Sequence, residues 1–120
     1  MNRAQVKRLS KIAKELHGKR EIRMPVVRYL GVRRGQVYVT NQHEHHIEPI
    51  QGVPDCVLPP GAIHILASLP GSDETELLTE AHPGPLGHDI VIYDPENEKR
   101  ISADGLPLDE FPFREEAAFK

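Results

Sequence analysis

Residues 3–17 read RAQVKRLSKIAKELH, a stretch with no proline or glycine in which apolar residues recur every three or four positions. At about 100° per residue the apolar positions cover an arc of about 120°, and the basic positions fall on the opposite side. Gly18 follows directly, and glycine readily adopts the positive φ of a helix end. We therefore predict an amphipathic helix. Its apolar face consists of Val6, Leu9, Ile12, Ala13 and Leu16, and its basic face of Arg3, Lys7, Lys11 and Lys14, with Arg8 at the edge.

The basic face has two interpretations. Most charged helix faces are simply solvated, and this one could be no more than that. Only Glu15 interrupts the cations, however, and like charges four residues apart oppose helix formation by a few tenths of a kcal/mol each. A polyanionic partner would offset that cost. The face has no aromatic side chain on which a nucleic-acid base could stack, so charge would dominate the contact.

The charge of the chain is divided unevenly along its length. Residues 1–40 carry eleven Lys or Arg and two Glu, a net charge of +9. Residues 41–120 carry four Lys or Arg and sixteen Asp or Glu, a net charge of −12, and the whole chain has a formal net charge of −3. A basic part of this kind suits contact with nucleic acid or with an acidic protein surface, and the opposite signs also permit self-association.

The segment after the first helix is typical of β structure. Residues 26–32 and 36–40 are rich in β-branched and aromatic residues, and Arg33, Arg34 and Gly35 between them predict the tight turn of a hairpin. The two arginines would extend the basic face if the turn and the helix point the same way.

Further along the chain we predict three more strands and one more helix. The strands are residues 62–69, 89–93 and 100–103, the last two forming a second hairpin. The helix begins after Ser72, whose hydroxyl suits the N-cap position, and ends at residues 82–84. The predicted fold class is α+β: an N-terminal amphipathic helix packed on a mainly antiparallel sheet of about five strands, with a short second helix and an extended C-terminal tail.

Length and composition favour one cytoplasmic domain. The 120 residues divide into a basic helix (1–20), a mainly β core (21–105) and an extended acidic and aromatic tail (106–120). Cys56 is the only cysteine, so we interpret it as a small buried residue of a reducing compartment. No run resembles a signal peptide or a membrane span, and we expect no membrane partner.

Three of the seven histidines lie in residues 41–49, NQHEHHIEP. If the strand of residues 36–40 continued without a bulge, His43 and His45 would point to the same face and could bind Zn²⁺ with a third ligand such as His64. A solvated loop ended by Pro49 is the simpler interpretation. A pH response is a third, since histidine titrates near ~6.5. No cofactor other than this zinc is expected.

All three phenylalanines lie in the last ten residues. Phe111 and Phe113 stand beside prolines that disfavour a regular helix, so they would either strap the tail across the core or form a linear motif for the groove of a partner. The strap is favoured because burial of each phenylalanine in a core poor in aromatics would contribute ~1.5–3 kcal/mol.

No catalytic motif is recognisable. The chain has no His-Glu-x-x-His helix, no Cys-x-x-Cys pair, no glycine-rich phosphate loop and no nucleophile elbow. We therefore expect a small non-enzymatic binding or accessory module whose basic N-terminal third contacts nucleic acid or an acidic protein surface. The alternative is a small metal-binding protein or metalloenzyme that uses His43, His45 and His64. The candidate residues for polyanion binding are Arg3, Lys7, Arg8, Lys11, Lys14, Arg33 and Arg34.

Overall fold

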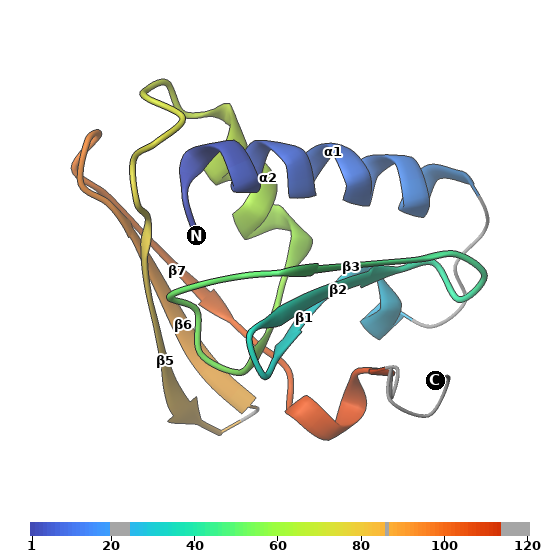
Figure 1. Ribbon diagram of the computed structural model, residues 1–120. Helices are drawn as coiled ribbons and strands as arrows, with labels where there is room; N and C mark the ends of the chain where they lie inside the picture. The colour runs from blue at the N-terminus through green and yellow to red at the C-terminus, as the bar shows by residue number, and fades with distance from the viewer. Residues whose placement is uncertain (20–24, 86, 114–120) are drawn as a thin grey trace.

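The computed structural model describes residues 1–19, 25–85 and 87–113. Across these residues the chain forms two α-helices and two antiparallel sheets, one of four strands and one of three (Figure 1). The predicted α+β class and the N-terminal helix are confirmed. The strands are divided between two sheets, whereas one sheet of about five strands was predicted.

The four-stranded sheet has the order β3-β2-β1-β4 and the three-stranded sheet the order β5-β6-β7. The second predicted hairpin is confirmed as β6 and β7. In chain order the elements are α1 (Arg3–Lys19), the 3-10 helix η1 (Pro25–Arg28), β1 (Leu30–Arg33), β2 (Gln36–Thr40), β3 (His45–Pro49), β4 (Cys56–Leu58), α2 (Pro60–Ser68), β5 (Leu78–Gly84), β6 (Gly87–Asp94), β7 (Lys99–Asp104) and the 3-10 helix η2 (Leu108–Glu110).

The helix α1 lies across one face of the four-stranded sheet and packs against α2, which also contacts β7 (Figure 1). Its predicted apolar face is the buried one: Val6 and Ala13 have no exposed surface and Leu9 is 1% exposed. Burial of these side chains drives α1 onto the sheet. The main core also includes Val37 and Val39 of β2, Ile63 and Leu66 of α2, and Ile90 and Ile92 of β6.

The first hairpin begins later than predicted. Pro25 opens the 3-10 helix η1, and β1 begins only at Leu30. Proline is well suited to the first position of a helical turn, where its missing N–H would have had no partner. The predicted tight turn is confirmed, because Arg33 pairs with Gln36 and the two residues between them, Arg34 and Gly35, have φ of 54° and 74°.

The predicted strand over residues 62–69 is wrong, because Pro60–Ser68 form the helix α2. The buried side chains Ala62, Ile63 and Leu66 fall at helical spacing, and a proline at the first turn favours a helix start. A short apolar run fits a strand and a buried helix equally well when only its hydrophobicity is considered.

The predicted helix over residues 72–84 is also wrong, because this segment forms a turn followed by β5. The carbonyls of Asp73 and Thr75 accept the backbone N–H groups of Ala4 and Arg3, both at 3.0 Å. These N–H groups belong to the first turn of α1 and have no partner within the helix. Tertiary hydrogen bonds to α1 therefore replace the local helix that the sequence favours.

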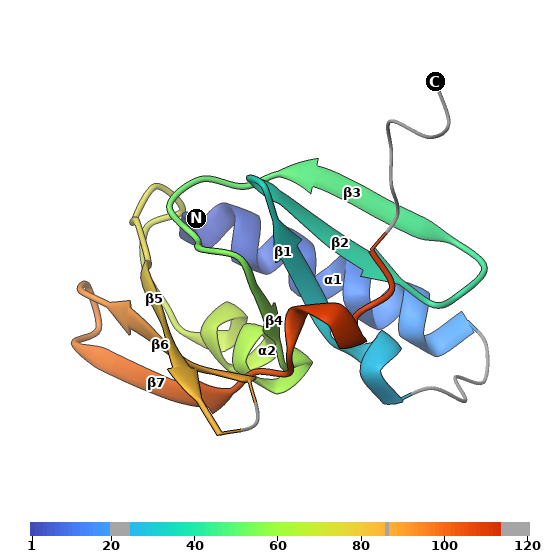
Figure 2. The ribbon, with the colours of Figure 1, turned by 90° about the horizontal axis from the view of Figure 1, so that it is seen from below.

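The opposite face of the four-stranded sheet is covered by the C-terminal segment, which crosses it through η2 (Figure 2). Phe111 is 4% exposed and packs with Tyr38 and Val57 in a second, smaller cluster. Gly31 of β1 permits this approach, because a Cβ there would lie 2.5 Å from the Phe111 ring. Phe111 therefore packs onto the core as the strap interpretation predicts. Residues 114–120 of the predicted tail lie outside the described residues.

Candidate anion-binding site

Arg3, the first predicted contact residue, is not on the outer surface. Its side chain has no exposed area, and its guanidinium donates hydrogen bonds to both carboxylate oxygens of Asp94, at 2.9 and 3.0 Å. It also contacts Glu96 at 3.4 Å and the carbonyl of Ser72 at 3.2 Å. This bidentate pair fixes the start of α1 to the end of β6, so Arg3 is removed from the predicted polyanion face.

The pair of Arg3 and Asp94 is charged at neutral pH. The hydrogen bond from Arg3 lowers the pKa of Asp94 to about 2, an effect that outweighs burial and is reinforced by Asn97. The same hydrogen bond raises the pKa of Arg3. The two charges balance each other inside the protein, and neither is available to a partner.

Arg8 is also balanced within the molecule, although its side chain is half exposed. It donates to Glu48 of β3 through Nε at 3.2 Å and through Nη2 at 2.6 Å. Glu48 is further contacted by Gln5 and His46, each at 2.7 Å. Burial alone would raise the pKa of Glu48, but the hydrogen bonds from Arg8, His46 and Gln5 lower it to about 2. Arg8 therefore connects α1 to the edge strand β3.

Lys7, Lys11 and Lys14 are the predicted contact residues of α1 that remain available at the surface. Lys7 Nζ lies 3.0 Å from Asp73 in an ion pair whose partners are 45% and 66% exposed. Within residues 1–19, 25–85 and 87–113, no carboxylate lies within ion-pair distance of Lys11 or Lys14. At about 100° per residue the three lysines lie within an arc of about 60°. We call them the lysine face.

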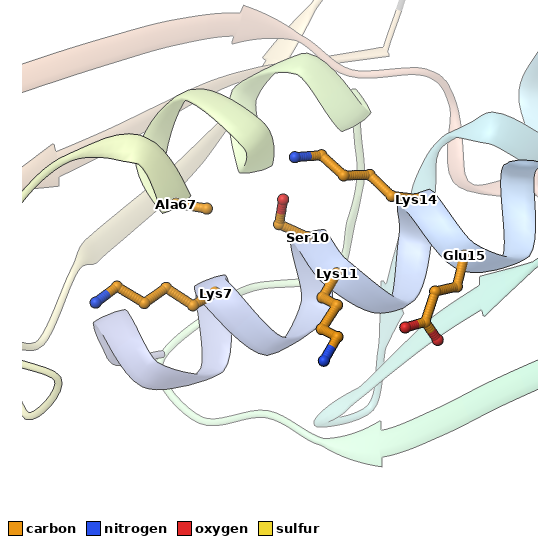
Figure 3. Close-up of a pocket in the computed structure, with 6 residues that line it drawn as sticks. All are labelled: Lys7, Ser10, Lys11, Lys14, Glu15 and Ala67. Carbon is orange, nitrogen blue, oxygen red and sulfur yellow. The ribbon is translucent and has the colours of Figure 1, made fainter.

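A shallow, open groove of about 420 Å³ lies beside the lysine face, between α1 and α2 (Figure 3). The lysines line it together with Ser10 and Glu15 of α1 and Ala67 of α2. Lys14 extends toward α2 on the same side as the hydroxyl of Ser10, whereas Lys11 points away from them (Figure 3). The groove therefore combines positive charge with one nearly buried hydroxyl.

The Ser10 hydroxyl is held by a histidine of the neighbouring helix. Its Oγ lies 2.7 Å from Nδ1 of His64, and Ser10 is only 4% exposed. Burial lowers the pKa of His64, and the charge of Lys14 lowers it further, so the imidazole is neutral at pH 7. A neutral imidazole either accepts a hydrogen bond from Ser10 or donates one to it, depending on which nitrogen carries the proton.

The turn of the first hairpin does not extend the lysine face. Arg33 has the same strand parity as Gly31 and points away from α1, where its guanidinium lies 4.4 Å from the ring centre of Phe113. Arg34 is exposed in the turn, and its backbone N–H donates to Asp55 at 3.0 Å. The structure thus separates Arg33 from the lysines by the thickness of the sheet.

The histidine segment turns back instead of continuing the strand. The side chain of Asn41 accepts the backbone N–H groups of His43 and Glu44, at 2.9 and 2.7 Å, and donates to the carbonyl of Leu16 at the end of α1. This reversal ends β2 at Thr40 and starts β3 at His45. The condition for His43 and His45 to share a face, a strand that continues through both, is therefore not met. The loop interpretation holds only for the turn before His45, because His45–Pro49 form β3.

The three proposed zinc ligands are not assembled into a site. His45 bonds to Thr40 at 2.7 Å, His43 is exposed in the turn, and His64 bonds to Ser10. Among the residues that the structure describes, no group of three or more His, Cys, Asp or Glu is placed to hold a metal ion.

Phe113 and Cys56 are both committed to packing. The Phe113 ring lies 4.8 Å from the ring centre of Phe111 and 5.0 Å from that of Tyr38. Cys56 is fully buried, as predicted, and burial, together with the charge of Asp55, raises the pKa of its thiol to about 12. The thiolate needed for nucleophilic chemistry is therefore not formed near neutral pH.

The sequence did not predict that Ser10 pairs with His64, or that Ala67 lines the groove. The helical arc that groups the lysines places Ser10 next to them, which is a usable signal. A strand over residues 62–69 gives no reason to place His64 or Ala67 beside Ser10, whereas the helix α2 brings both against α1.

No family model, no curated protein and no solved structure matches this chain. Over the described residues, no helix is both long enough and apolar enough to cross a bilayer.

Proposed function

We propose that the protein is a non-enzymatic binding module whose lysine face and adjoining groove bind an acidic segment of a partner protein. The observation that carries this proposal is the difference among the cations of α1. Arg3 and Arg8 are neutralised by buried or partly buried carboxylates, whereas Lys11 and Lys14 have no carboxylate within ion-pair distance among the described residues. A partner that supplies carboxylates would relieve the repulsion between these like charges.

The dimensions of the lysine face suit an extended peptide. From Lys7 to Lys14 the helix rises about 10 Å at about 1.5 Å per residue. Side chains on one face of an extended chain repeat about every 6.6 Å, so an acidic segment of about five residues spans the three lysines. Such a segment would lie along α1 and contact Ala67 of α2 across the groove.

Nucleic acid fits this surface less well. Three lysines neutralise about three phosphates, so the electrostatic contribution that dominates non-specific binding to DNA would be small. Neither an aromatic side chain nor an arginine lines the groove for base stacking.

The proposal is tested by fluorescence anisotropy with a labelled ten-residue peptide of Asp and Glu, at about 20 and 200 mM NaCl. We expect binding that weakens about tenfold at the higher salt concentration, because exposed charges are screened. We also expect the variant Lys11→Gln/Lys14→Gln to lose most of the affinity. Binding that is absent, or that does not change with salt, would overturn the proposal.

The matched control removes the same number of charges elsewhere. Lys99 and Arg100 are exposed on β7, outside the groove, so Lys99→Gln/Arg100→Gln should bind the peptide as the unaltered protein does. Equal losses in the two double variants would mean that net charge alone, and not the lysine face, governs binding. A single-stranded oligonucleotide of equal charge is compared in the same assay. If it binds more tightly than the peptide, the partner is nucleic acid and not an acidic protein.

A further inference from the structure

Besides its lysines, the groove contains the hydroxyl of Ser10, a hydrogen-bonding group that the attraction between opposite charges does not require. Ser10 is nearly buried, yet it lines the groove, and its hydroxyl is fixed at 2.7 Å from Nδ1 of His64. Lys14 extends along the same side as the Ser10 hydroxyl (Figure 3). Its charge also lowers the pKa of His64. A hydroxyl, an ammonium group and a neutral imidazole are therefore gathered where α1 faces α2.

The pair of Ser10 and His64 can present a proton to an anion. With the imidazole proton on Nδ1, His64 donates to Ser10 Oγ, and the serine proton is free to point into the groove. With the proton on Nε2, Ser10 donates to His64 and offers only lone pairs, which an anion would avoid. A bound anion selects the first arrangement and gains a hydrogen bond from a donor that is already held in place.

The number of donors favours a phosphate monoester over a carboxylate. The Ser10 hydroxyl is a single donor and the Lys14 ammonium has three, and Lys7 lines the same groove. A phosphorylated side chain carries a charge of about −1.5 to −2 at pH 7 and three acceptor oxygens. A carboxylate has one charge and two oxygens, so it would leave part of this donor set unused.

We propose that the groove beside Ser10, Lys14 and His64 binds a phosphate monoester, carried by a phosphorylated serine or threonine in the acidic segment of a partner protein. This inference rests on the proposed function, because the lysine face positions the segment that carries the phosphate. Ser10 donates to a phosphate oxygen, Lys14 pairs with the dianion, and Ala67 leaves the space that the group needs.

Three labelled acidic peptides test the inference, identical except for serine, glutamate or phosphoserine at the centre. We expect the phosphoserine peptide to bind about tenfold more tightly than the glutamate peptide, equivalent to one additional charge-assisted hydrogen bond. Ser10→Ala and Lys14→Gln should each remove most of this preference. Lys11→Gln is the matched control, because Lys11 points away from Ser10, and it should weaken the two anionic peptides equally.

A further variant alters the groove without changing any charge. Ala67→Met should fill the space beside Ser10 and reduce phosphoserine binding about tenfold while leaving the glutamate peptide less affected. Circular dichroism would verify that the Ser10→Ala and Ala67→Met variants are folded, and Lys14→Gln tests the same site at an exposed residue where folding is not at risk.

The possible outcomes separate this inference from the proposed function. Equal binding of the glutamate and phosphoserine peptides, or a preference that survives both Ser10→Ala and Lys14→Gln, overturns the phosphate site and leaves the proposed function intact. Failure of all three peptides to bind overturns both. Inorganic phosphate should compete only at millimolar concentration. If inorganic phosphate competes as strongly as the phosphopeptide, the site binds a free small anion, and the proposal of a phosphorylated partner segment is overturned. Tighter binding of a 5′-phosphorylated oligonucleotide than of the phosphopeptide would overturn it as well.

Discussion

Arg3 and Arg8 share one helix with Lys11 and Lys14, but the two pairs of cations have different surroundings. The arginines meet carboxylates from β6 and β3, which lie far away in the sequence. The lysines line a groove in which no described carboxylate pairs with them. The guanidinium group is planar and binds a carboxylate through two hydrogen bonds, whereas the ammonium group is compact and strongly hydrated. In α1 the arginines therefore stabilise the fold, and the lysines remain exposed at the surface.

Removal of the buried arginine should have the largest effect on stability. Arg3→Met should lower the free energy of unfolding by about 3 kcal/mol, because Asp94 would remain buried without a compensating charge. Urea denaturation measures this loss. Lys11→Met is the control on the same helix, and its effect should stay within about 0.5 kcal/mol. Equal effects of the two substitutions would show that the arginine and the lysine do not differ in role.

Acid should weaken the same ion pairs without any substitution. The pKa of Asp94 is about 2 in the folded protein, below the value of 3.8 that an unperturbed carboxyl shows, and the pKa of Glu48 is lowered similarly. Groups with a lowered pKa stabilise the fold fully above the unfolded pKa and lose this effect as pH falls through the folded one. The free energy of unfolding should therefore fall between about pH 4.5 and 2, by about 2 kcal/mol for Asp94. Urea denaturation at several pH values measures it, and Asp94→Asn should flatten the curve.

Some of this organisation could be predicted from the sequence. The helix α1 was predictable because its apolar period is uninterrupted. Its end was predicted wrongly, because α1 continues through Gly18 to Lys19 and Gly18 does not have a positive φ. The lysine face could be predicted from the same period. The pairing of Arg3 with Asp94 was not predictable, because the two are 91 residues apart and charge alone does not determine distance.

The errors in secondary structure also have physical causes. Hydrogen bonds from the first turn of α1 hold residues 73–75 in a turn, and a propensity for local helix cannot compete with them. Asn41 reverses the chain through its side chain, a contact that strand alternation ignores. The pairing of Ser10 with His64 depends on α2 being a helix. The predicted strand over residues 62–69 therefore could not indicate it.

A smaller change concerns the exposed arginine. Arg8→Gln should lower the free energy of unfolding by only about 1 kcal/mol, because its side chain is 54% exposed and Glu48 retains His46 and Gln5. The pKa of Glu48 should rise at the same time, which NMR titration of its side chain would detect. A loss as large as that of Arg3→Met would show that exposure does not distinguish the two arginines.

The smallest effect is expected from a substitution that releases Lys7 from its ion pair. Asp73→Asn removes the exposed ion pair with Lys7, so it should change stability by less than about 0.5 kcal/mol and increase affinity for an acidic peptide about two- to threefold. Glu74→Gln is the matched control at the adjacent exposed carboxylate. Equal gains in both variants would point to net charge and not to the release of Lys7.

The most direct measurement determines peptide affinity and the free energy of unfolding together, for Lys11→Gln/Lys14→Gln and for Asp94→Asn. We predict that the lysine variant loses binding to the acidic peptide and unfolds at the same urea concentration as the unaltered protein. The Asp94 variant should unfold at lower urea concentration and bind as before while it is folded. A lysine variant that still binds, or that loses stability as much as the Asp94 variant, would contradict the division of α1 into structural arginines and partner-binding lysines.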